Sequence, residues 1–403
     1  MSLPVITISP RAAARIARGH LWIFANEIDM AAVPAEKGAW RRFACKGTVV
    51  ATGYCNRHSL IAGRVAAAAD IGDIPALLFR RLTDAFSQRL TLWKQAGSAR
   101  LLFSESDLLP GLIVDAYGDV LVAQSSTAGI DAVLGDLEKA IPRAYEQVFG
   151  ARPSAFVLRG DASVRRLEGI GEFARIVFGD EARIIRGSLV ENRVTYAADF
   201  LHGQKTGFFL DQRDNRVFLG RLAAETGART MLDLCCYSGG WGLRALSAGA
   251  ETVTFVDQSD DALRIAARGL ESNGVAPERA HLANVDVFEF LAQDAATYDI
   301  VVADPPAFVK SQKELPKARA AYEKLNRLAW RRVKPGGHLI TCSCSYHLAE
   351  ADFLDMLRAA VSREHGMAHI VYRGGQAQDH PALLSMPETS YLKCAALRKT
   401  GGE

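Results

Sequence analysis

The sequence predicts an α/β protein whose C-terminal half contains a parallel sheet with helices on both faces. From about residue 212 onward, helical segments alternate with short apolar strands, a pattern typical of such sheets. The strands expected there are Thr230–Leu234, Thr252–Val256, Ile300–Ala303 and His338–Thr341. Each is followed by polar or glycine-containing residues, and a turn is expected at residues 334–337, just before the last strand. Because ligands bind at the carboxyl ends of parallel strands, we expect a site at that edge of the sheet.

Two smaller domains are expected before this sheet. Residues 1–70 alternate short apolar runs with glycine and polar breaks, which predicts a β-rich module with one short helix near residues 10–18. The residues after 76 mix helical and strand patterns, with a hairpin around residues 117–119 and a helix near residues 130–149, and predict an α+β domain. The expected domains are therefore residues 1–70, 71–185 and 186–403.

The composition is that of an ordinary globular protein. The 403 residues are 49% hydrophobic and 23% charged, and a chain of this length buries a large core without crosslinks. No apolar run approaches the roughly 20 residues that a membrane-spanning helix needs, and the first residues have no signal-peptide pattern. The seven cysteines show no disulfide framework or metal-ligand spacing. We expect a reduced, cytoplasmic protein with no metal site and no membrane segment.

Basic residues are concentrated in the N-terminal module, although the net charge of the whole chain is only +3. The module carries Arg11, Arg15, Arg18, Lys37, Arg41, Arg42, Lys46, Arg57 and Arg64 against Glu27, Asp29, Glu36 and Asp70. A basic module is a candidate binder of a nucleic-acid backbone, but a solvated basic face explains the same charge. Our candidates for RNA contact are Arg11, Arg15 and Arg18 on the expected helix.

The first strand of the C-terminal sheet leads into a candidate cofactor loop. Asp233 lies near the strand end, and Tyr237, Gly239 and Gly240 precede the next helix. Glycines let a ligand approach the backbone closely. The second strand ends in Asp257, where a carboxylate can accept hydrogen bonds from both hydroxyls of a ribose. These residues are our candidate cofactor contacts.

Two more polar residues are assigned to the cofactor. Gln258 directly follows the second strand, and Asp286 ends a third expected strand, where it can meet the adenine amino group. A surface position explains Asp286 as well. The Gly-x-Gly-x-x-Gly fingerprint of dinucleotide enzymes is absent, and S-adenosylmethionine carries no phosphate that would require it. The loop therefore favours S-adenosylmethionine, while a nicotinamide site and a purely structural loop stay open.

The next two strands supply candidate catalytic residues. Asp304 follows one strand and precedes two prolines, which fix the chain there. Cys342 and Cys344 lie on the other strand and share a face, with Cys344 nearer the carboxyl end. A cysteine in a strand is often a small core residue, and Asp304 can simply end a turn. The alternative is that Cys344 is a nucleophile and Asp304 holds a base.

This pair suits methylation of carbon 5 of a pyrimidine. Addition of a thiolate to carbon 6 makes carbon 5 nucleophilic, and an acid at N3 stabilises the charge that develops in the ring. Methylation of an amino group needs no cysteine, and enzymes that do it commonly place an aromatic residue directly after the double proline. This chain has Ala307 at that position.

Several runs resemble one known family, the bacterial PUA-domain methyltransferases that make 5-methylcytosine in large-subunit ribosomal RNA. The runs that carry the resemblance are His20–Phe24, Glu105–Leu112, Gln204–Arg216, Asp379–Pro381 and Tyr391–Lys393, so the resemblance covers nearly the whole chain. It implies an N-terminal PUA β-barrel, an α+β middle domain and a class I, Rossmann-like methyltransferase domain. It also implies that the cysteine of the Ser-Cys-Ser element, Cys344, attacks the base.

The resemblance has further implications for binding. Residues 208–216 either close over the cofactor, with Phe209 and Gln212 as contacts, or pack between domains; Lys205 and Lys310 are assigned to RNA. Cys235 and Cys236 stand in the cofactor loop where many methyltransferases have glycine. The expected function is cytosine-C5 methylation of large-subunit ribosomal RNA with S-adenosylmethionine as cofactor. A guanine methyltransferase of the same fold and a non-catalytic RNA-binding or ribosome-assembly protein are the alternatives. The oligomeric state stays open, a homodimer being one option.

Overall fold

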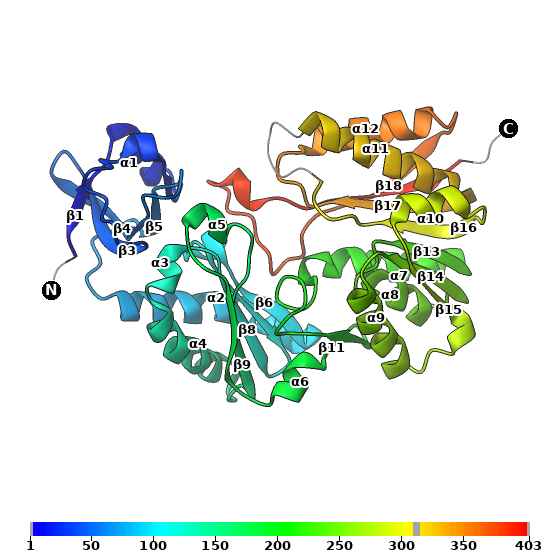
Figure 1. Cartoon of the computed structure of the whole chain (residues 1–403), viewed down its shortest axis with the longest axis horizontal. Helices are drawn as coiled ribbons and strands as arrows, with labels where there is room; N and C mark the ends of the chain where they lie inside the picture. Colours follow the sequence, from blue (N-terminus) through cyan, green and yellow to red (C-terminus); the bar gives the residue numbers. More distant parts are fainter. Residues whose placement is uncertain (1–2, 309–314, 401–403) are drawn as a thin grey trace. The chain divides into compact units, whose positions relative to one another are not determined.

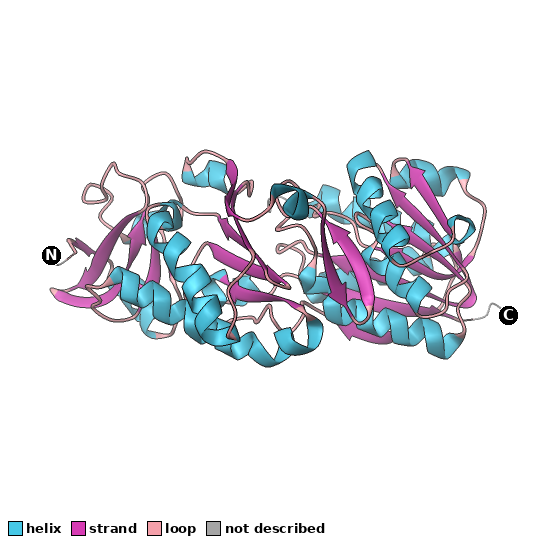
Figure 2. Cartoon of the chain, turned by 90° about the horizontal axis from the view of Figure 1, so that it is seen from below, coloured by secondary structure: helices cyan, strands magenta, loops and turns pink. Residues whose placement is uncertain are grey.

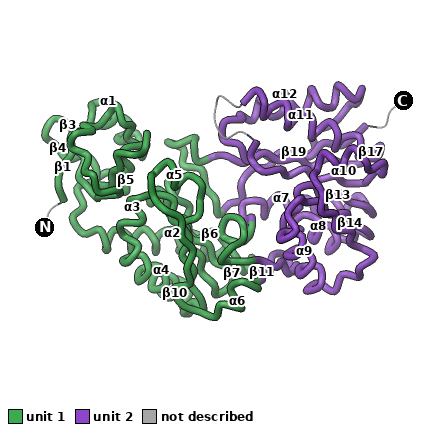
Figure 3. Tube along the Cα trace, viewed as in Figure 1, with its two compact units in different colours: residues 1–187, 199–208, 379–389 green, residues 188–198, 209–378, 390–403 purple. Residues whose placement is uncertain are grey.

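The computed structural model describes residues 3–308 and 315–400, which form two units. The first unit comprises residues 1–187, 199–208 and 379–389, and the second comprises residues 188–198, 209–378 and 390–403 (Figure 3). The chain therefore passes from one unit to the other several times, and a late segment of the sequence, residues 379–389, belongs to the first unit. Each unit is described below by itself.

A five-stranded sheet with the order β1-β3-β4-β5-β2 begins the first unit. Its strands are β1 (Val5–Thr7), β2 (Trp22–Ile23), β3 (Ala39–Cys45), β4 (Thr48–Cys55) and β5 (Gly63–Ala67). Helix α1 (Pro10–Ala17) starts where the Ser9 side chain accepts a hydrogen bond from the N–H of Ala12, and it buries Ile16 in the core of this module. The expected β-rich module with one short helix is confirmed.

A second sheet of the first unit has the order β10-β9-β8-β7-β6. Its strands are β6 (Ser98–Phe103), β7 (Leu112–Tyr117), β8 (Val120–Ser125), β9 (Ala155–Gly160) and β10 (Phe173–Phe178). Its helices are α2 (Ile74–Ala96), α3 (Ala128–Asp131), α4 (Leu134–Phe149), α5 (Arg165–Glu168) and α6 (Glu181–Ile185). The expected hairpin is confirmed, because β7 and β8 are an antiparallel pair around Gly118.

The single helix expected near residues 130–149 is wrong, because the chain forms α3 and α4 there. The break lies at Ala132 and Val133, just before α4 begins. Helix α3 is held against the first sheet: Trp40 Nε1 donates to the carbonyl of Gly129 (3.1 Å), and a Cβ at Gly129 would lie 2.0 Å from the ring of Tyr54. The position of Gly129 therefore leaves no room for a larger side chain in α3.

The two sheets of the first unit share one hydrophobic core. Trp40 and Tyr54 from the first sheet pack in the same cluster as Leu78 of α2 and Ile141 of α4. A buried ion pair, Arg64 Nη1 to Glu168 Oε1 at 2.8 Å, also joins the first sheet to α5. The boundary that we place at residue 70 therefore lies between two sheets of one unit.

A seven-stranded sheet with the order β15-β14-β13-β16-β17-β19-β18 organises the second unit. Its strands are β13 (Thr230–Leu234), β14 (Thr252–Asp257), β15 (Ala280–Asn284), β16 (Tyr298–Ala303), β17 (Val333–Ser343), β18 (Ala368–Gly374) and β19 (Lys393–Lys399). Strands β13 to β17 pair in parallel, and β19 is antiparallel to both of its neighbours. The parallel sheet predicted from the alternating pattern is confirmed.

Helices cover both faces of this sheet. They are α7 (Arg213–Thr226), α8 (Gly240–Ser247), α9 (Asp260–Ser272), α10 (Val287–Gln293), α11 (Leu315–Arg331) and α12 (Glu350–Ser362). Helices α7, α8 and α9 lie on one face, and α10, α11 and α12 lie on the other (Figure 1). Figure 2 shows the chain from below, with the helices and strands in different colours. A short hairpin of β11 (Gly187–Glu191) and β12 (Val194–Ala198), which we did not predict, packs against α9.

Two details of the predicted strands are wrong. The turn expected at residues 334–337 lies inside β17 as a bulge, because Tyr298 pairs with Val333 whereas Ile300 pairs with His338. Strand β15 ends at Asn284, and Asp286 instead caps α10, where its Oδ1 accepts the N–H of Phe288 (2.8 Å). An aspartate at an N-cap satisfies helix donors that otherwise have no partner. In the part of the chain that the structure describes, no helix is long and apolar enough to cross a membrane.

Candidate functional site

The register of the parallel strands brings the predicted site residues to one edge of the sheet. Leu234 at the end of β13 pairs with Val256 on one side and with Ala303 on the other, and Ala303 pairs with Thr341 of β17. The residues that follow these positions therefore meet where the strand order reverses between β13 and β16, which is where open α/β sheets bind ligands. Asp257, Asp304 and Cys344 all follow one of these strand ends.

The loop after β13 has an unusual backbone. Cys235, Tyr237 and Gly239 have positive φ angles of 60°, 47° and 75°. Such angles cost a non-glycine residue roughly 1–3 kcal/mol unless the surroundings stabilise them. Here the N–H of Cys236 donates to the carbonyl of Val256 (3.1 Å), and the N–H of Tyr237 donates to Asp257 Oδ2 (2.9 Å). The loop is held open in a fixed shape, and α8 begins directly after it at Gly240.

Asp233 is a buried carboxyl group beneath this loop. Its side chain is fully buried, its Oδ2 accepts the N–H of Gly242 (2.9 Å), and its Oδ1 has no hydrogen-bond partner among the described residues. Burial raises the pKa of Asp233 well above its usual range, and the nearby carboxylates of Asp304 and Asp257 raise it further. A cationic ligand at this position would favour the ionised form and would supply the missing partner for Oδ1.

Asp257 is anchored at the tip of β14. Its Oδ2 accepts from the loop at Tyr237, and its Oδ1 accepts the N–H of Ser259 (2.9 Å), the residue that caps α9. Each carboxylate oxygen can accept a second hydrogen bond, so Asp257 can still meet two hydroxyl groups. Gln258, the next residue, is exposed. Asp286 is also exposed and uses one oxygen for the cap of α10.

Asp304 joins three elements of the second unit. Its Oδ2 accepts hydrogen bonds from Gln212 Nε2 and from Trp241 Nε1, each at 3.0 Å. The amide of Gln212 is oriented in turn, because its Oε1 accepts from Asn215 Nδ2 (2.6 Å) and Asn215 is held by the hydroxyl of Tyr372 (2.9 Å). We predicted Gln212 near the site but missed Trp241 and Asn215. A tryptophan in the first turn of the helix after the cofactor loop was the available signal.

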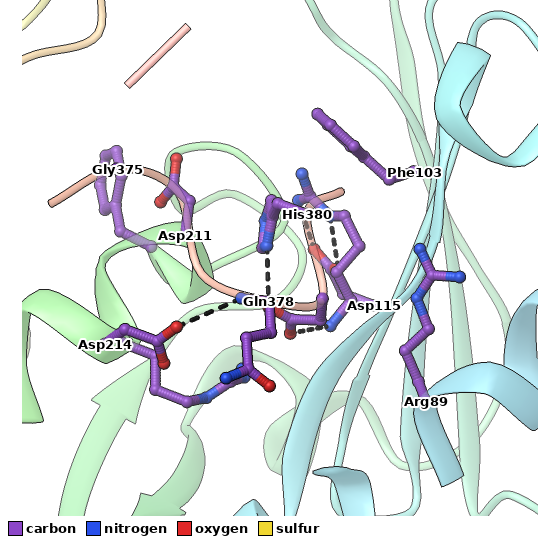
Figure 4. A network of polar contacts seen from close by, with 12 residues as sticks. Arg89, Phe103, Asp115, Asp211, Asp214, Gly375, Gln378 and His380 are labelled. Carbon is purple, nitrogen blue, oxygen red and sulfur yellow. Dashed lines mark hydrogen bonds and ion pairs between the residues drawn. The ribbon is translucent and has the colours of Figure 1, made fainter. Parts of the chain in front are cut away.

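The predicted run 208–216 contacts the cofactor loop on one side and the body of the second unit on the other. The ring of Phe209 lies edge-on to Tyr237, with centroids 5.3 Å apart. Arg216 is buried and binds Glu191 of β11 through both carboxylate oxygens, at 2.9 and 2.7 Å. Asp214 Oδ2 accepts the N–H of Gln378 at 3.3 Å (Figure 4). These contacts fix Phe209 and Gln212 at the ligand edge of the sheet.

The two cysteines of β17 and its end have different surroundings. Cys342 is fully buried, and burial raises the pKa of its thiol well above the usual range. Cys344 is half-buried and follows the last residue of β17. A thiolate is the reactive form, so burial makes Cys342 a poor nucleophile and favours Cys344. Strand β17 pairs directly with β16, so Cys344 is one strand away from Asp304, as predicted.

The basic residues assigned to RNA have different roles in the first unit. Arg15 binds both oxygens of Glu27 at 2.7 and 2.6 Å and is mostly covered, whereas the side chain of Arg11 is 83% exposed. Arg18 is also exposed. Arg11 and Arg15 line a pocket of about 390 Å³ together with Phe24, Ala25, Asn26, Glu27 and Leu60. Lys205 is half-buried in the first unit, and Lys310 lies outside the described residues.

The late segment of the first unit contains another run that we singled out from the sequence. His380 is buried, its Nδ1 lies 2.9 Å from Asp379 Oδ1, and its ring packs against Phe103 (Figure 4). Asp379 Oδ2 accepts the N–H of Arg100 in β6 (2.8 Å). Met386 enters the core of the N-terminal module. This run therefore has a structural role in the described residues.

Comparison with known families gives two matches along the chain. Residues 6–67 match the model of a PUA-like domain, and residues 177–393 match the model of an S-adenosylmethionine-dependent methyltransferase. The second match covers more than half of the chain. The described residues contain no group of His, Cys, Asp or Glu side chains arranged to hold a metal ion.

Curated relatives and solved structures agree with these matches. The chain is 33% identical to the ribosomal RNA large subunit methyltransferase I of Tolumonas auensis, over 94% of this chain and 96% of the relative. It is 34% identical to the protein of the same name from Aliivibrio fischeri strain MJ11, over the same shares of the two chains. A methyltransferase solved in complex with SAH has a TM-score of 0.82 at 19% identity, covering 98% of this chain and all of that one. A methyltransferase from Streptococcus mutans has a TM-score of 0.81 at 18% identity, with the same coverage.

The fold predicted from the sequence, a PUA-like module followed by a Rossmann-like methyltransferase sheet, is thus confirmed. The carboxylates of Asp233, Asp257 and Asp304 around the cofactor loop also fit a positively charged cofactor, because a nearby cation favours their ionised forms. S-adenosylmethionine is therefore the cofactor, and the chain belongs to the family of S-adenosylmethionine-dependent methyltransferases with an N-terminal PUA-like domain that includes the proteins named ribosomal RNA large subunit methyltransferase I.

Proposed function

We propose that this enzyme methylates carbon 5 of a cytosine in large-subunit ribosomal RNA. The observation that carries the proposal is the half-buried thiol of Cys344, which lies at the same sheet edge as the cofactor loop and one strand from Asp304. The names of the relatives and the PUA-like domain support an RNA substrate. Ala307 after the double proline supports carbon methylation, because no aromatic ring stands there to stack on a base.

The carboxylates of the second unit are assigned to parts of the cofactor. Asp233 supplies its unpartnered oxygen to the cationic methionine portion, and Asp257 accepts the ribose hydroxyls. Phe209 and Tyr237 flank the adenosyl portion, with Gly239 and Gly240 allowing close approach. We keep Gln258 and Asp286 as contacts to the adenosyl portion, although Asp286 also caps α10. When bound, the cofactor supplies the electrophilic methyl group.

The residues of the chain perform the remaining chemistry. The Cys344 thiolate adds to carbon 6, which opens the carbon 5–carbon 6 double bond, and carbon 5 takes the methyl group. A base then removes the proton of carbon 5, and the carbon 6–sulfur bond breaks to restore the ring and the thiolate. Asp304 acts as the acid at N3: it gives its proton to N3 as the thiolate adds, and its carboxylate then accepts hydrogen bonds from N3–H and the amino group, which stabilises the adduct. N3 returns this proton when the carbon 6–sulfur bond breaks. Gln212 and Trp241 fix the carboxylate for this task.

The N-terminal module is assigned to RNA contact. We propose that residues 1–70 bind RNA, that residues 71–185 form the middle domain and that residues 186–403 catalyse the reaction. Arg11 in α1 and Arg18, the residue that caps the end of α1, are exposed and can meet phosphates, whereas Arg15 is committed to Glu27. The RNA contacts assigned to Lys205 and Lys310 remain predictions.

The role of Asp233 predicts a pH-dependent cofactor affinity. Burial raises the pKa of Asp233, so the free enzyme keeps this carboxyl protonated to higher pH than an exposed aspartate, while a cation favours the ionised form. Cofactor affinity should therefore increase with pH through the raised pKa and decrease as pH falls through it. Asp233→Asn should lose a charge-assisted hydrogen bond worth about 1.5–3 kcal/mol, a weakening of at least tenfold, together with this pH dependence. Calorimetric titration with S-adenosylmethionine at several pH values measures both.

Asp260→Asn is the matched control for this prediction, because Asp260 is an exposed acid in the first turn of α9 and pairs with Arg264. Its affinity should equal that of the wild type. Equal affinities and equal pH profiles for Asp233→Asn and wild type would contradict the assignment of Asp233.

The role of Cys344 predicts a covalent complex with RNA. RNA that carries 5-fluorocytosine at the target should trap the adduct, because fluorine cannot leave as a proton does. The wild type should give a complex that survives denaturing electrophoresis, and Cys344→Ala should give none while binding S-adenosylmethionine normally. Cys342→Ala should still trap. Normal methylation by Cys344→Ala would overturn the proposal and favour the guanine methyltransferase.

The exposed arginines in α1 and at its C-terminal cap predict a change in the salt dependence of RNA binding. The double variant Arg11→Gln/Arg18→Gln should bind a large-subunit ribosomal RNA transcript more weakly, with a salt slope smaller by about 0.7–0.9 for each phosphate that the variant no longer neutralises. Filter binding at several salt concentrations measures the slope. Arg15→Gln, which breaks the pair with Glu27, should lower the melting temperature more than the double variant does. An unchanged slope in the double variant would show that these arginines form only a solvated face.

A further inference from the structure

Lys393 belongs to the run Tyr391–Lys393, to which neither the sequence nor the proposed reaction gives a role. It is the first residue of β19, and its register partner in β17 is Ser343, the residue before Cys344. Its Nζ donates to the carbonyl of Ser345, the residue after Cys344, at 2.6 Å, and to the carbonyl of Tyr391 at 2.8 Å. The ammonium group of Lys393 is therefore fixed beside the backbone on either side of Cys344.

The charge of Lys393 interacts with Cys344. Burial lowers the pKa of Lys393 to about 8, while the negative charges of Cys344 and Glu350 oppose that effect. The ammonium form thus predominates at neutral pH. Two of its three N–H donors are used by carbonyl groups, and the third has no hydrogen-bond partner among the described residues. A cation beside a cysteine favours the thiolate.

Other groups near Cys344 come from the two helices that cover this face. Tyr322 of α11 interacts electrostatically with Cys344, and its hydroxyl lies 2.9 Å from Ser345 Oγ. Burial raises the pKa of Tyr322, so the phenol is neutral at physiological pH and adds no negative charge beside the Cys344 thiolate. Glu350 of α12 interacts with Lys393 and helps to keep it protonated.

We propose that Lys393 is a positioning residue of this enzyme, whose ammonium group keeps Cys344 in the thiolate form and fixes it at the end of β17. This inference rests on the proposed role of Cys344 as the nucleophile. Lys393 acts through the thiol and does not itself contact the base. Lys393 should stabilise the Cys344 thiolate below about pH 8, and this stabilisation should disappear as Lys393 loses its proton above that pH.

The test is the pH profile of Cys344 alkylation in the full-length enzyme without RNA. Iodoacetamide reacts with the thiolate, and peptide mass spectrometry gives the rate at Cys344 alone. Lys393→Gln removes the charge but keeps amide N–H donors for the carbonyls of Ser345 and Tyr391. The alkylation midpoint should rise by about one pH unit or more, so that the rate at pH 7 falls about tenfold. Lys393→Arg should restore the wild-type midpoint.

Lys399→Gln is the matched control. Lys399 lies on the same strand, its pKa is also lowered by burial, and its Nζ likewise donates to two carbonyls, those of Trp330 and Val333. It should leave the Cys344 midpoint unchanged. If Lys393→Gln does not fold, as judged by its melting curve and by S-adenosylmethionine binding, the comparison of Lys393→Arg and Lys393→Met decides in its place. An unchanged midpoint in a folded neutral variant overturns the proposal.

The readout distinguishes this proposal from the proposed function. Because alkylation follows the Cys344 thiol in enzyme without RNA, it does not depend on the trapping of RNA. A shifted midpoint without any trapped RNA counts against Cys344 as the nucleophile, whereas trapped RNA with an unshifted midpoint counts against Lys393. In turnover, Lys393→Gln should lower kcat at neutral pH and leave the affinity for S-adenosylmethionine unchanged.

Discussion

The parallel register of β13, β14, β16 and β17 is the constraint on which the whole site depends. Because Leu234 pairs with both Val256 and Ala303, the residues just beyond these strands lie at one edge. A shift of one residue would turn a neighbouring side chain to the opposite face of the sheet. In the observed register, the pairing of these strands brings the cofactor loop, Asp304 and the end of β17 to the same edge of the sheet. The helices on both faces supply the burial that holds this register.

Burial gives chemically similar side chains different roles at this edge. Asp233 is fully buried, and one of its oxygens has no hydrogen-bond partner among the residues that the structure describes. Asp257 instead accepts hydrogen bonds from two backbone N–H groups and is half-buried. The same contrast separates Cys342, which is inside the sheet, from Cys344, which lies just beyond it. A site that collects several carboxylates with little solvent is unfavourable when empty and is stabilised by a cation.

The sequence predicted the elements of the second unit well because its strands are short, apolar and regularly spaced. It could not predict the tertiary contacts that orient the site, such as the hydrogen bond from Trp241 to Asp304, since these join residues far apart in the chain. The division of α3 from α4 was also missed, because residues 130–149 read as one helical pattern while the chain turns at Ala132 and Val133. Arg15 was indistinguishable from Arg11 by charge, and only its contact with Glu27 separates them.

The central claim is that this enzyme makes 5-methylcytosine, and it is tested most directly by nucleoside mass spectrometry of large-subunit ribosomal RNA. RNA from a strain that lacks the enzyme should lose 5-methylcytosine from one position. Wild-type protein should restore it, and Cys344→Ala should not. The account is contradicted if the strain keeps all of its 5-methylcytosine and instead loses a methylated guanine, because the same fold would then carry a reaction that does not need Cys344.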